Sequence, residues 1–418
     1  MMLGKSIIKA LLMLYGIVLT NTISAQQLAD STATNIEAAT IVKKKPAECD
    51  IKDVVKKIFK NHQQQLKDSS LLSAKKVFLT ILPAAGYTLQ TGFAAAVSTS
   101  IAFYTDTTAT KRFSSIFSSM TYTQYNQFLF PIYANIWTKK NKFNLILDYH
   151  FLKYPSTTYG IGARTTENDA YSLNFNYIKL HQTLLKKIYK ELYGGVGFYY
   201  DYFWNVIEVD PPAGVKTSFQ KYGGTPTMKA AGIAFKILYD SRQNQINPSK
   251  GLFANIIYRP NYTFLGSDKN WKSLILECRK YLKLNQHTRN TLALWSYNWF
   301  TLGKEKPPYL LLPSTGWDDL YNIGRGYIQS RFRAKDMIYA EAEYRFGITQ
   351  NGLLGGVVFA NAQSFSKNLS NQLSVIAPGC GAGLRIKLNK YSNTNLCIDY
   401  GFGMNGSKGL FLNLGEVF

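Results

Sequence analysis

Apolar and polar side chains alternate at every second position along most of the chain. Residues 143–151 carry apolar side chains at odd positions, and residues 338–348 carry them at even positions. Successive side chains of a β-strand point to opposite faces, so this period of two predicts strands from about residue 76 to 418. In residues 338–348 the other face carries charged side chains in mid-strand, including Glu341 and Glu343. These strands therefore have one apolar face and one charged face.

The charged face argues against a small β-sandwich, because mid-strand charges in its core would have no water. A membrane barrel with a water-filled lumen gives them water, while its apolar face meets lipid. We therefore predict an all-β fold, a transmembrane antiparallel β-barrel over residues 77–418. Strands of about 10 residues, with turns and longer outer loops, allow about 14 to 16 strands in that length. We also expect the odd-numbered apolar residues of 171–177 to face lipid.

The two ends of the barrel are predicted from amphipathic stretches. The period of two places the first strand near residues 87–103 and the last strand near residues 410–418. In the last strand Leu412, Leu414 and the terminal Phe418 are expected on one apolar face. An amphipathic last strand that ends in an aromatic residue is typical of bacterial outer-membrane barrels, so these three residues are the predicted C-terminal assembly signal.

The N-terminal segments differ from the rest of the chain. Residues 1–25 carry Lys5 and Lys9 near their start, continue with a short apolar core and end in Ile-Ser-Ala, which is typical of a secretory signal peptide. Residues 26–76 are predicted to be a periplasmic leader with a short amphipathic helix that begins at Asp50, a favourable N-cap residue. This helix either docks on the main body, plugs the lumen, or rests on an anionic membrane surface.

The composition is basic but poor in charged residues. The formal net charge is +23, yet only 17% of residues are charged, against about 25% in an average soluble domain. A basic chain can bind nucleic acid, but an exported protein does not meet it, and we predict no nucleic-acid partner. The basic residues instead suit the anionic headgroups of outer-membrane lipid or lipopolysaccharide, or an anion-attracting lumen.

The reactive side chains do not form a recognisable catalytic or metal site. Cys380 and Cys397 are expected on opposite faces of neighbouring strands, so they cannot form a disulfide, and all four cysteines are interpreted as structural. No cysteine pair has the spacing of zinc ligands. No G-x-S-x-G motif occurs, and His150 and Asp148 are expected not to face each other within one strand. We therefore predict no catalytic residue, no metal and no cofactor.

Six short motifs follow one another along the predicted barrel. They are Pro83-Ala84-Ala85-Gly86-Tyr87 with Thr91-Gly92, Tyr239–Gly251, Gly324-Arg325-Gly326-Tyr327, Glu343-Tyr344-Arg345-Phe346, Ala377–Arg385 and Leu414–Phe418. In this order they resemble the BamA/TamA outer-membrane assembly family, whose barrel is the bacterial surface antigen domain. The resemblance covers about residues 80–418 and implies a barrel in the outer membrane of a Gram-negative bacterium.

The second motif resembles the family's turn with tyrosine-aspartate-x-arginine followed by proline-x-x-glycine. The matching residues here are Asp240, Arg242, Pro248 and Gly251. Proline cannot donate a hydrogen bond to a strand ladder, and glycine allows tight backbone geometry, so both suit a turn between strands.

The third motif resembles the tip of the family's sixth outer loop, which latches onto the inner wall of the barrel. The matching residues are Gly324, Arg325, Gly326 and Tyr327. Glu343 has the inward parity to accept the Arg325 guanidinium, and such a pair can be bidentate. Asn361 stands where the family often has a carboxylate, so the latch is expected to rest on Glu343 alone. The alternative is a solvated arginine in a mobile outer loop.

The resemblance implies that the barrel assists insertion of membrane proteins, or transfer of protein or lipid, at a lateral seam between the first and last strands. Unfolded outer-membrane proteins and a separate periplasmic partner would then be its partners. Residues 26–76 are too short and too polar for a POTRA module, the family's usual docking platform, which weakens the expectation of general client recruitment. A passive channel and a lipid-modifying enzyme are the alternatives.

Overall fold

A computed structural model gives the fold of most of the barrel. It describes residues 48–58, 77–88, 92–105, 112–211, 214–285, 288–317, 322–367, 369–390 and 392–418. The predicted signal peptide and most of the predicted leader lie outside the described residues.

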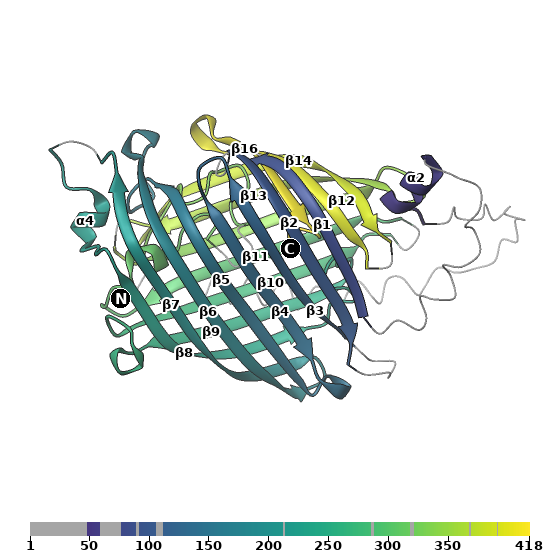
Figure 1. Ribbon diagram of the computed structural model, residues 1–418, viewed down its shortest axis with the longest axis horizontal. Coiled ribbons are helices and arrows are strands. Elements are labelled where there is room, and N and C mark those ends of the chain that lie inside the picture. Colours follow the sequence, from purple (N-terminus) through teal and green to yellow (C-terminus); the bar gives the residue numbers. More distant parts are fainter. Residues whose placement is uncertain are drawn as a thin grey trace, which may run out of the picture. The chain divides into compact units, whose positions relative to one another are not determined.

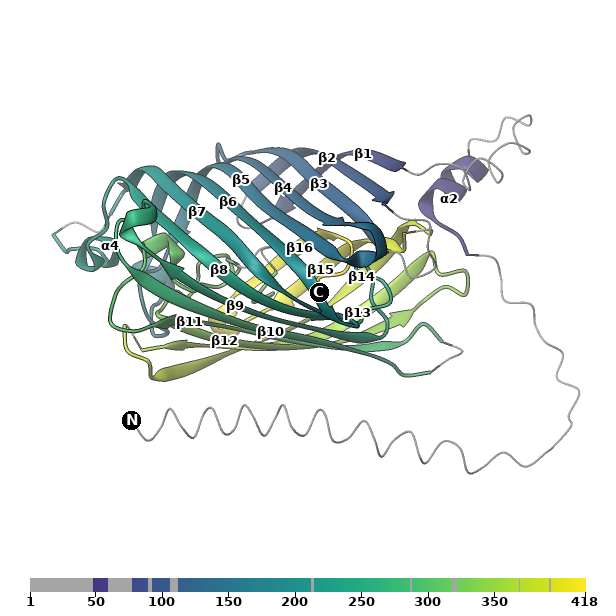
Figure 2. The ribbon, with the colours of Figure 1, turned by 90° about the horizontal axis from the view of Figure 1, so that it is seen from below.

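Sixteen strands in the described part of the chain form one antiparallel sheet in which each strand pairs with its neighbours in sequence. The strands are β1 (Val77–Thr88), β2 (Gly92–Tyr104), β3 (Phe113–Thr123), β4 (Phe128–Trp137), β5 (Phe143–Thr158), β6 (Tyr171–Tyr189), β7 (Leu192–Val209), β8 (Met228–Asp240), β9 (Gly251–Asn261), β10 (Trp271–Lys283), β11 (Thr291–Leu302), β12 (Asp336–Gly347), β13 (Leu354–Ser366), β14 (Leu373–Asn389), β15 (Thr394–Phe402) and β16 (Lys408–Leu414). The sheet curls into a barrel, so the predicted fold class is confirmed (Figure 1, Figure 2).

The connections differ between the two ends of the barrel. Short turns join the strands at the end where the helix α2 (Ile51–Ile58) lies, and the helix α4 (Ser218–Tyr222) belongs to a longer loop at the other end (Figure 1). The connection between β11 and β12, residues 303–335, is called loop 6 below. Five short 3-10 helices complete the elements of the described residues: η1 (Lys139–Asn141), η2 (Glu167–Asp169), η3 (Thr263–Leu265), η4 (Tyr309–Leu311) and η5 (Met404–Gly406). Within the described ranges, we find no helix with the length and apolar character that a bilayer crossing requires.

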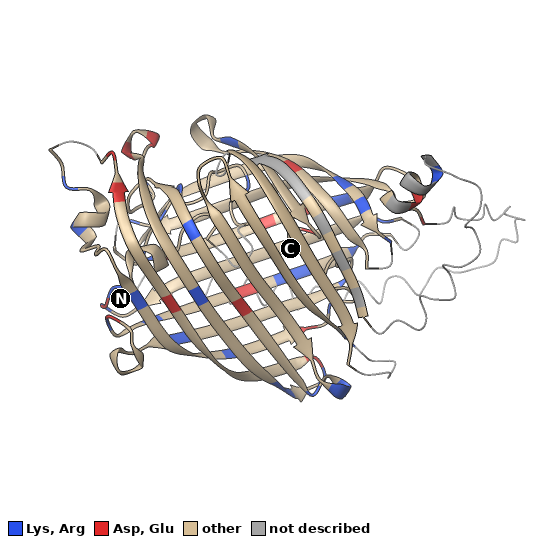
Figure 3. Cartoon of the chain, in the orientation of Figure 1, with Lys and Arg blue, Asp and Glu red and all other residues tan. Residues whose placement is uncertain are grey.

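The two faces of the sheet have the predicted contrast along β12. Glu341, Glu343 and Arg345 are buried on the inner face, whereas the alternate residues are more exposed. Uncharged stretches of strand separate the charged residues, many of which lie near the strand ends (Figure 3). Cys380 is exposed and Cys397 is buried, which confirms that their side chains lie on opposite faces.

The aromatic face of β6 points into the barrel, so the expectation that it meets lipid is wrong. Tyr171, Leu173, Phe175 and Tyr177 are all buried, and they pack in one cluster with apolar residues of loop 6. The period of two separates the faces of a strand but does not say which face is inside. Because loop 6 brings apolar side chains into the outer part of the lumen, the wall that it contacts is apolar as well.

The strand predicted to be first is the second strand of the barrel. Residues 87–103 do not form one strand, because β1 ends at Thr88 and β2 begins at Gly92. Gly92 has a φ of +62°, which glycine adopts without strain. The uncharged sequence on both sides of this turn continues the alternation, so the pattern alone did not reveal the break.

The helix α2 is capped and anchored by Asp50. One carboxylate oxygen of Asp50 accepts a hydrogen bond from the backbone N–H of Asp53 (3.1 Å), and the other accepts one from the N–H of Lys390 (3.1 Å). The Lys390 ammonium lies 2.8 Å from the Asp53 carboxylate. These contacts join the helix to the turn between β14 and β15, and they favour docking on the main body over the two alternatives.

We predict that Asp50→Ala frees α2 from the barrel. Loss of an aspartate N-cap costs about 1 kcal/mol, and this substitution also removes the acceptor of the Lys390 N–H. Hydrogen–deuterium exchange of residues 51–58 should rise strongly in this variant and stay unchanged in Lys57→Ala, whose side chain is exposed. Equal exchange in Asp50→Ala and the wild type would show that other contacts hold the helix.

Candidate functional site

The tip of loop 6 lies inside the barrel against its inner wall. Arg325 has no exposed surface, and Tyr327 is 3% exposed. Gly324 and Gly326 have φ angles of +82° and +109°, and a Cβ atom at Gly326 would lie 2.6 Å from the carbonyl oxygen of Phe402. Glycine at both positions lets the loop turn sharply, and this turn places the Arg325 side chain against the inner wall.

Three carboxylates surround the Arg325 guanidinium. It forms ion pairs with Glu341 and Glu343 on β12 and with Asp399 on β15. The central carbon atom of the guanidinium, Cζ, lies 3.8 Å from the ring centroid of Phe359 on β13. Burial alone would lower the pKa of Arg325, but the three carboxylates hold this pKa well above its usual value, so the guanidinium is charged at any physiological pH.

Two further arginines extend this arrangement toward the C-terminus. Arg345 Nε donates a hydrogen bond to Glu343 (2.7 Å), and Arg385 Nε donates one to Glu416 (2.8 Å). Arg385 also pairs with Asp399. The charges of this buried group nearly cancel, as those of buried ions must if they are to remain charged. Its members are Arg325, Arg345 and Arg385 with Glu341, Glu343, Asp399 and Glu416.

Glycines on β14 and β15 make the wall flat where the loop tip rests. A Cβ atom on Gly379 would lie 2.9 Å from the carbonyl oxygen of Arg325, and a Cβ atom on Gly401 would lie 2.7 Å from the backbone nitrogen of Gly326. The Asn361 side chain donates a hydrogen bond to the same Arg325 carbonyl (2.9 Å). Asn361 thus contacts the backbone of the tip. The Arg325 guanidinium does not need a carboxylate at position 361, because three other carboxylates already pair with it.

The phenol of Tyr327 fixes the tip from its other side. It donates a hydrogen bond to the carbonyl oxygen of Pro378 (2.5 Å) and accepts one from the backbone N–H of Met404 (2.9 Å). Ser407 donates a hydrogen bond to the Gly326 carbonyl (2.8 Å). The loop tip therefore contacts β14 and the outer turn between β15 and β16 as well as β12 and β13.

The end of the chain turns into the lumen, so the expectation that Phe418 shares a face with Leu412 and Leu414 is wrong. Gly415 has a φ of +89°, and the alternation of β16 stops there. Leu412 and Leu414 are 38% and 40% exposed, whereas Phe418 is 3% exposed. The role of the three residues as an assembly signal stays a prediction.

Groups from three elements hold the inward-turned end. The ring of Phe418 stacks on Trp295 of β11, with centroids 5.0 Å apart. Arg345 donates a hydrogen bond to the backbone oxygen of Phe418 (2.9 Å). Asn322 of loop 6 donates one to the carbonyl of Val417 (2.8 Å).

The predicted turn motif lies at the inner end, between β8 and β9. Asp240 accepts hydrogen bonds from the Arg242 side chain at 2.9 and 3.0 Å. Gly251 has a φ of +115°, and a Cβ atom there would lie 2.5 Å from the Ser241 carbonyl. Pro248 is close enough for its carbonyl oxygen to accept a long hydrogen bond from Arg345 (3.5 Å). This turn therefore reaches the same arginine that holds Phe418.

A second charged group occupies the lumen wall formed by β5 and β6. His150 Nε2 lies 2.8 Å from the Asp148 carboxylate, and the Lys179 ammonium lies 2.5 Å from it. The expectation that His150 and Asp148 do not face each other is therefore wrong. Residues two apart in a strand share a face, and the imidazole is long enough to reach back to its neighbour.

The sequence predicts only part of the site around Arg325. The structure brings Arg325 and Glu343 together, as the resemblance implied, but Glu341 and Asp399 were missed as acceptors. Both have inward parity in their strands, which is the signal that could have found them. Parity does not reveal which inward residues a long loop contacts.

The first and last strands are not joined by a hydrogen-bonded ladder in the described residues. Some Cα atoms of β1 and β16 lie within 8 Å of one another. Strand β1 has 12 residues and β16 has 7. The backbone edge of β1 is therefore longer than the strand that lies beside it.

We predict that Arg325→Ala releases loop 6. Removal of one partner of a buried ion pair typically costs about 3 to 5 kcal/mol, and here three carboxylates would be left facing one another. Limited proteolysis should cut residues 303–335 much faster, and the barrel should unfold at a lower temperature. Arg279→Ala is the control, because Arg279 pairs with Glu277 of its own strand. Unchanged cleavage of loop 6 in Arg325→Ala would contradict the latch.

We predict that Gly401→Ala displaces the loop tip while all charges remain. The added methyl group would lie 2.7 Å from the nitrogen of Gly326, so the backbone of the tip has to move. Proteolysis of loop 6 should rise toward the rate of Arg325→Ala. Gly347→Ala is the matched control, since its Cβ would meet only the Arg289 side chain, at 3.7 Å. Wild-type cleavage rates in Gly401→Ala would show that the tip does not need this flat wall.

Comparisons with known proteins agree with this geometry. The model of the Omp85 superfamily domain matches residues 89–408. No curated protein sequence matches the chain. Among solved structures, BamA from Haemophilus ducreyi lacking POTRA domains 1–3 is 13% identical, with a TM-score of 0.53 over 80% of this chain and 70% of that one.

Two structures of CdiB show the same fold. CdiB from Acinetobacter baumannii is 13% identical, with a TM-score of 0.51, and CdiB from Escherichia coli is 8% identical, with a TM-score of 0.54. The matches cover 82% and 81% of this chain but only 60% and 62% of the two CdiB chains. The match to the Omp85 superfamily domain spans well over half of this chain. The chain is therefore an outer-membrane barrel that belongs to the Omp85 superfamily.

Proposed function

We propose that this barrel assists the insertion of β-strand membrane proteins at the junction between β1 and β16, which we call the lateral seam. The observation that carries the proposal is the absence of a ladder between these two strands in the described residues. Unpaired N–H and C=O groups on a strand edge are a template for another strand. An incoming strand can add to such an edge by main-chain hydrogen bonds.

The inward turn of the chain end supports the same proposal. Because β16 stops at Leu414 and the last residues turn into the lumen, β16 is too short to cover the whole edge of β1 in the described part of the chain. Arg345 and Trp295 hold Phe418 in this position. The end of the chain is thereby kept from pairing with the whole edge of β1.

The loop-6 latch stiffens the wall beside the seam, on the side of β16. Arg325 joins β12 and β15 by ion pairs, and its neighbour Tyr327 adds β14. Opening of the barrel is therefore confined to the junction where the ladder is missing. The clients would be unfolded outer-membrane proteins, and a separate periplasmic partner would deliver them.

A passive channel is a weaker alternative for this chain. The residues Tyr309, Leu310, Leu311 and Leu312 of loop 6 are buried in a cluster with side chains of the inner wall. A lumen filled in this way opposes free diffusion of solutes. The channel alternative predicts conductance in planar bilayers with no effect on protein folding.

Locking the seam tests the proposed function. In a background with the four native cysteines replaced by alanine, Leu79 and Ile81 of β1 are each paired with Leu410 or Leu412 of β16 as double-cysteine variants. Liposomes that contain the protein are given a urea-unfolded test barrel, and its folding is followed by its altered electrophoretic mobility. Oxidation that forms the cross-link should abolish the acceleration of folding, and reduction should restore it.

A cross-link inside an existing ladder is the control. Ile101 and Ile116 lie opposite each other in the ladder between β2 and β3, so a disulfide between cysteines at these positions should leave the acceleration unchanged. Full activity with the β1–β16 cross-link formed would exclude insertion at the seam.

A further inference from the structure

An arginine of loop 6 is buried without an acidic partner. Arg333 is 2% exposed and lies two residues before the end of the loop. Its guanidinium donates hydrogen bonds to the carbonyl oxygen of Tyr309 (3.1 Å) and to the hydroxyl of Ser330 (3.1 Å). Its Nε is buried with no hydrogen-bond partner. A guanidinium has five N–H donors, so most of its capacity is unused.

The surroundings of Arg333 supply no negative charge among the described residues. The ionisable groups that face it are the phenols of Tyr309, Tyr171 and Tyr222, and burial lowers the pKa of Arg333. Arginine nevertheless stays protonated in proteins. An unpaired buried charge costs several kcal/mol. Arg325, on the same loop, shows the ordinary solution, because three carboxylates neutralise it.

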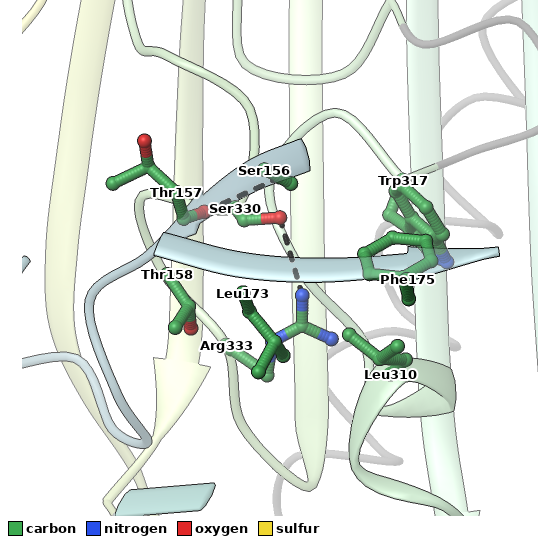
Figure 4. A pocket seen from close by; sticks show the side chains of 9 residues that line it. All are labelled: Ser156, Thr157, Thr158, Leu173, Phe175, Leu310, Trp317, Ser330 and Arg333. Carbon is green, nitrogen blue, oxygen red and sulfur yellow. Dashed lines mark hydrogen bonds between the residues drawn. The ribbon is translucent and has the colours of Figure 1, made fainter. Parts of the chain in front are cut away.

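A cavity adjoins the Arg333 guanidinium. It is small, with room for about one water-sized sphere, and it is partly open to solvent. Figure 4 shows the Ser330 hydroxyl joined to the Arg333 guanidinium, and Ser156, Leu173 and Leu310 among the other residues that line the cavity. Ser330 accepts its hydrogen bond from Arg333, so its own O–H is available to donate to a ligand.

We propose that this cavity binds a small monovalent anion, a halide, against Arg333. The free Nε–H and the Ser330 O–H are donors, and the guanidinium supplies the opposite charge. The apolar neighbours lower the local dielectric constant and so strengthen the attraction between the ions. A larger anion such as gluconate carries several hydroxyl groups that the apolar part of the wall cannot satisfy.

The bound anion stabilises the outer end of the barrel. The backbone of Arg333 forms bridges with Gly162, in the loop between β5 and β6, and with Ser314 of loop 6. The N–H of Gly162 donates to the carbonyl of Arg333 (2.7 Å). Neutralising the side chain at this crossing point therefore strengthens the contact between the two outer loops.

Thermal unfolding of the purified barrel in detergent tests the site. Chloride, acetate and gluconate are compared as sodium salts at equal ionic strength. Chloride should raise the midpoint by a few °C in a saturable way, as ligand binding to the folded state does. Acetate and gluconate, which are larger than the cavity, should not raise it in this way.

Two matched variants separate site binding from general salt effects. Arg333→Gln should lose the chloride response. Arg331→Gln should keep it, because the Arg331 guanidinium donates to Thr165 (2.8 Å) and does not line the cavity. An equal response in Arg333→Gln and the wild type, or no response in the wild type, would overturn the proposal.

A second measurement does not depend on the stability of the variants. Wild-type crystals grown in bromide should show an anomalous peak within hydrogen-bond distance of Arg333. A cavity that holds only water in such crystals would also overturn the proposal.

Discussion

The burial of Arg325 among three carboxylates is the constraint on which the interior of this barrel depends. Each of these ions would be costly to bury alone, and together they are stable only when the loop tip is seated. The guanidinium therefore ties a long outer loop to β12 and β15. Glycines on the neighbouring strands are required because the tip approaches the wall at backbone distance.

This seated loop organises both ends of the lumen. At the outer end it brings apolar residues against the aromatic face of β6. Toward the inner end, Arg345 and Arg385 continue the charge pairing to Glu416 and the last residue of the chain. One half of the sheet is thus cross-linked through its interior, while the junction between β1 and β16 has no ladder in the described residues. This asymmetry is the physical basis of the proposed function.

The sequence predicted the class of fold and the pair of Arg325 with Glu343. The features that it did not predict have physical explanations. Alternation identified the strands and the inward parity of Glu343, because both depend on local geometry. It could not show that Phe175 points into the barrel, because the lumen there is filled by apolar side chains of loop 6. It also misplaced Phe418, since the left-handed residue Gly415 ends the alternation three residues earlier. Glu341 and Asp399 depend on where a long loop lands, which no local pattern encodes.

A latched barrel whose first and last strands are unpaired should accelerate the folding of other barrels. The most direct measurement is the folding rate of an unfolded test barrel in liposomes that are empty, contain the wild type, or contain Arg325→Ala. Folding should be faster with the wild type than with empty liposomes, and most of that gain should be lost with Arg325→Ala. Equal rates with the wild type and with empty liposomes would contradict this prediction.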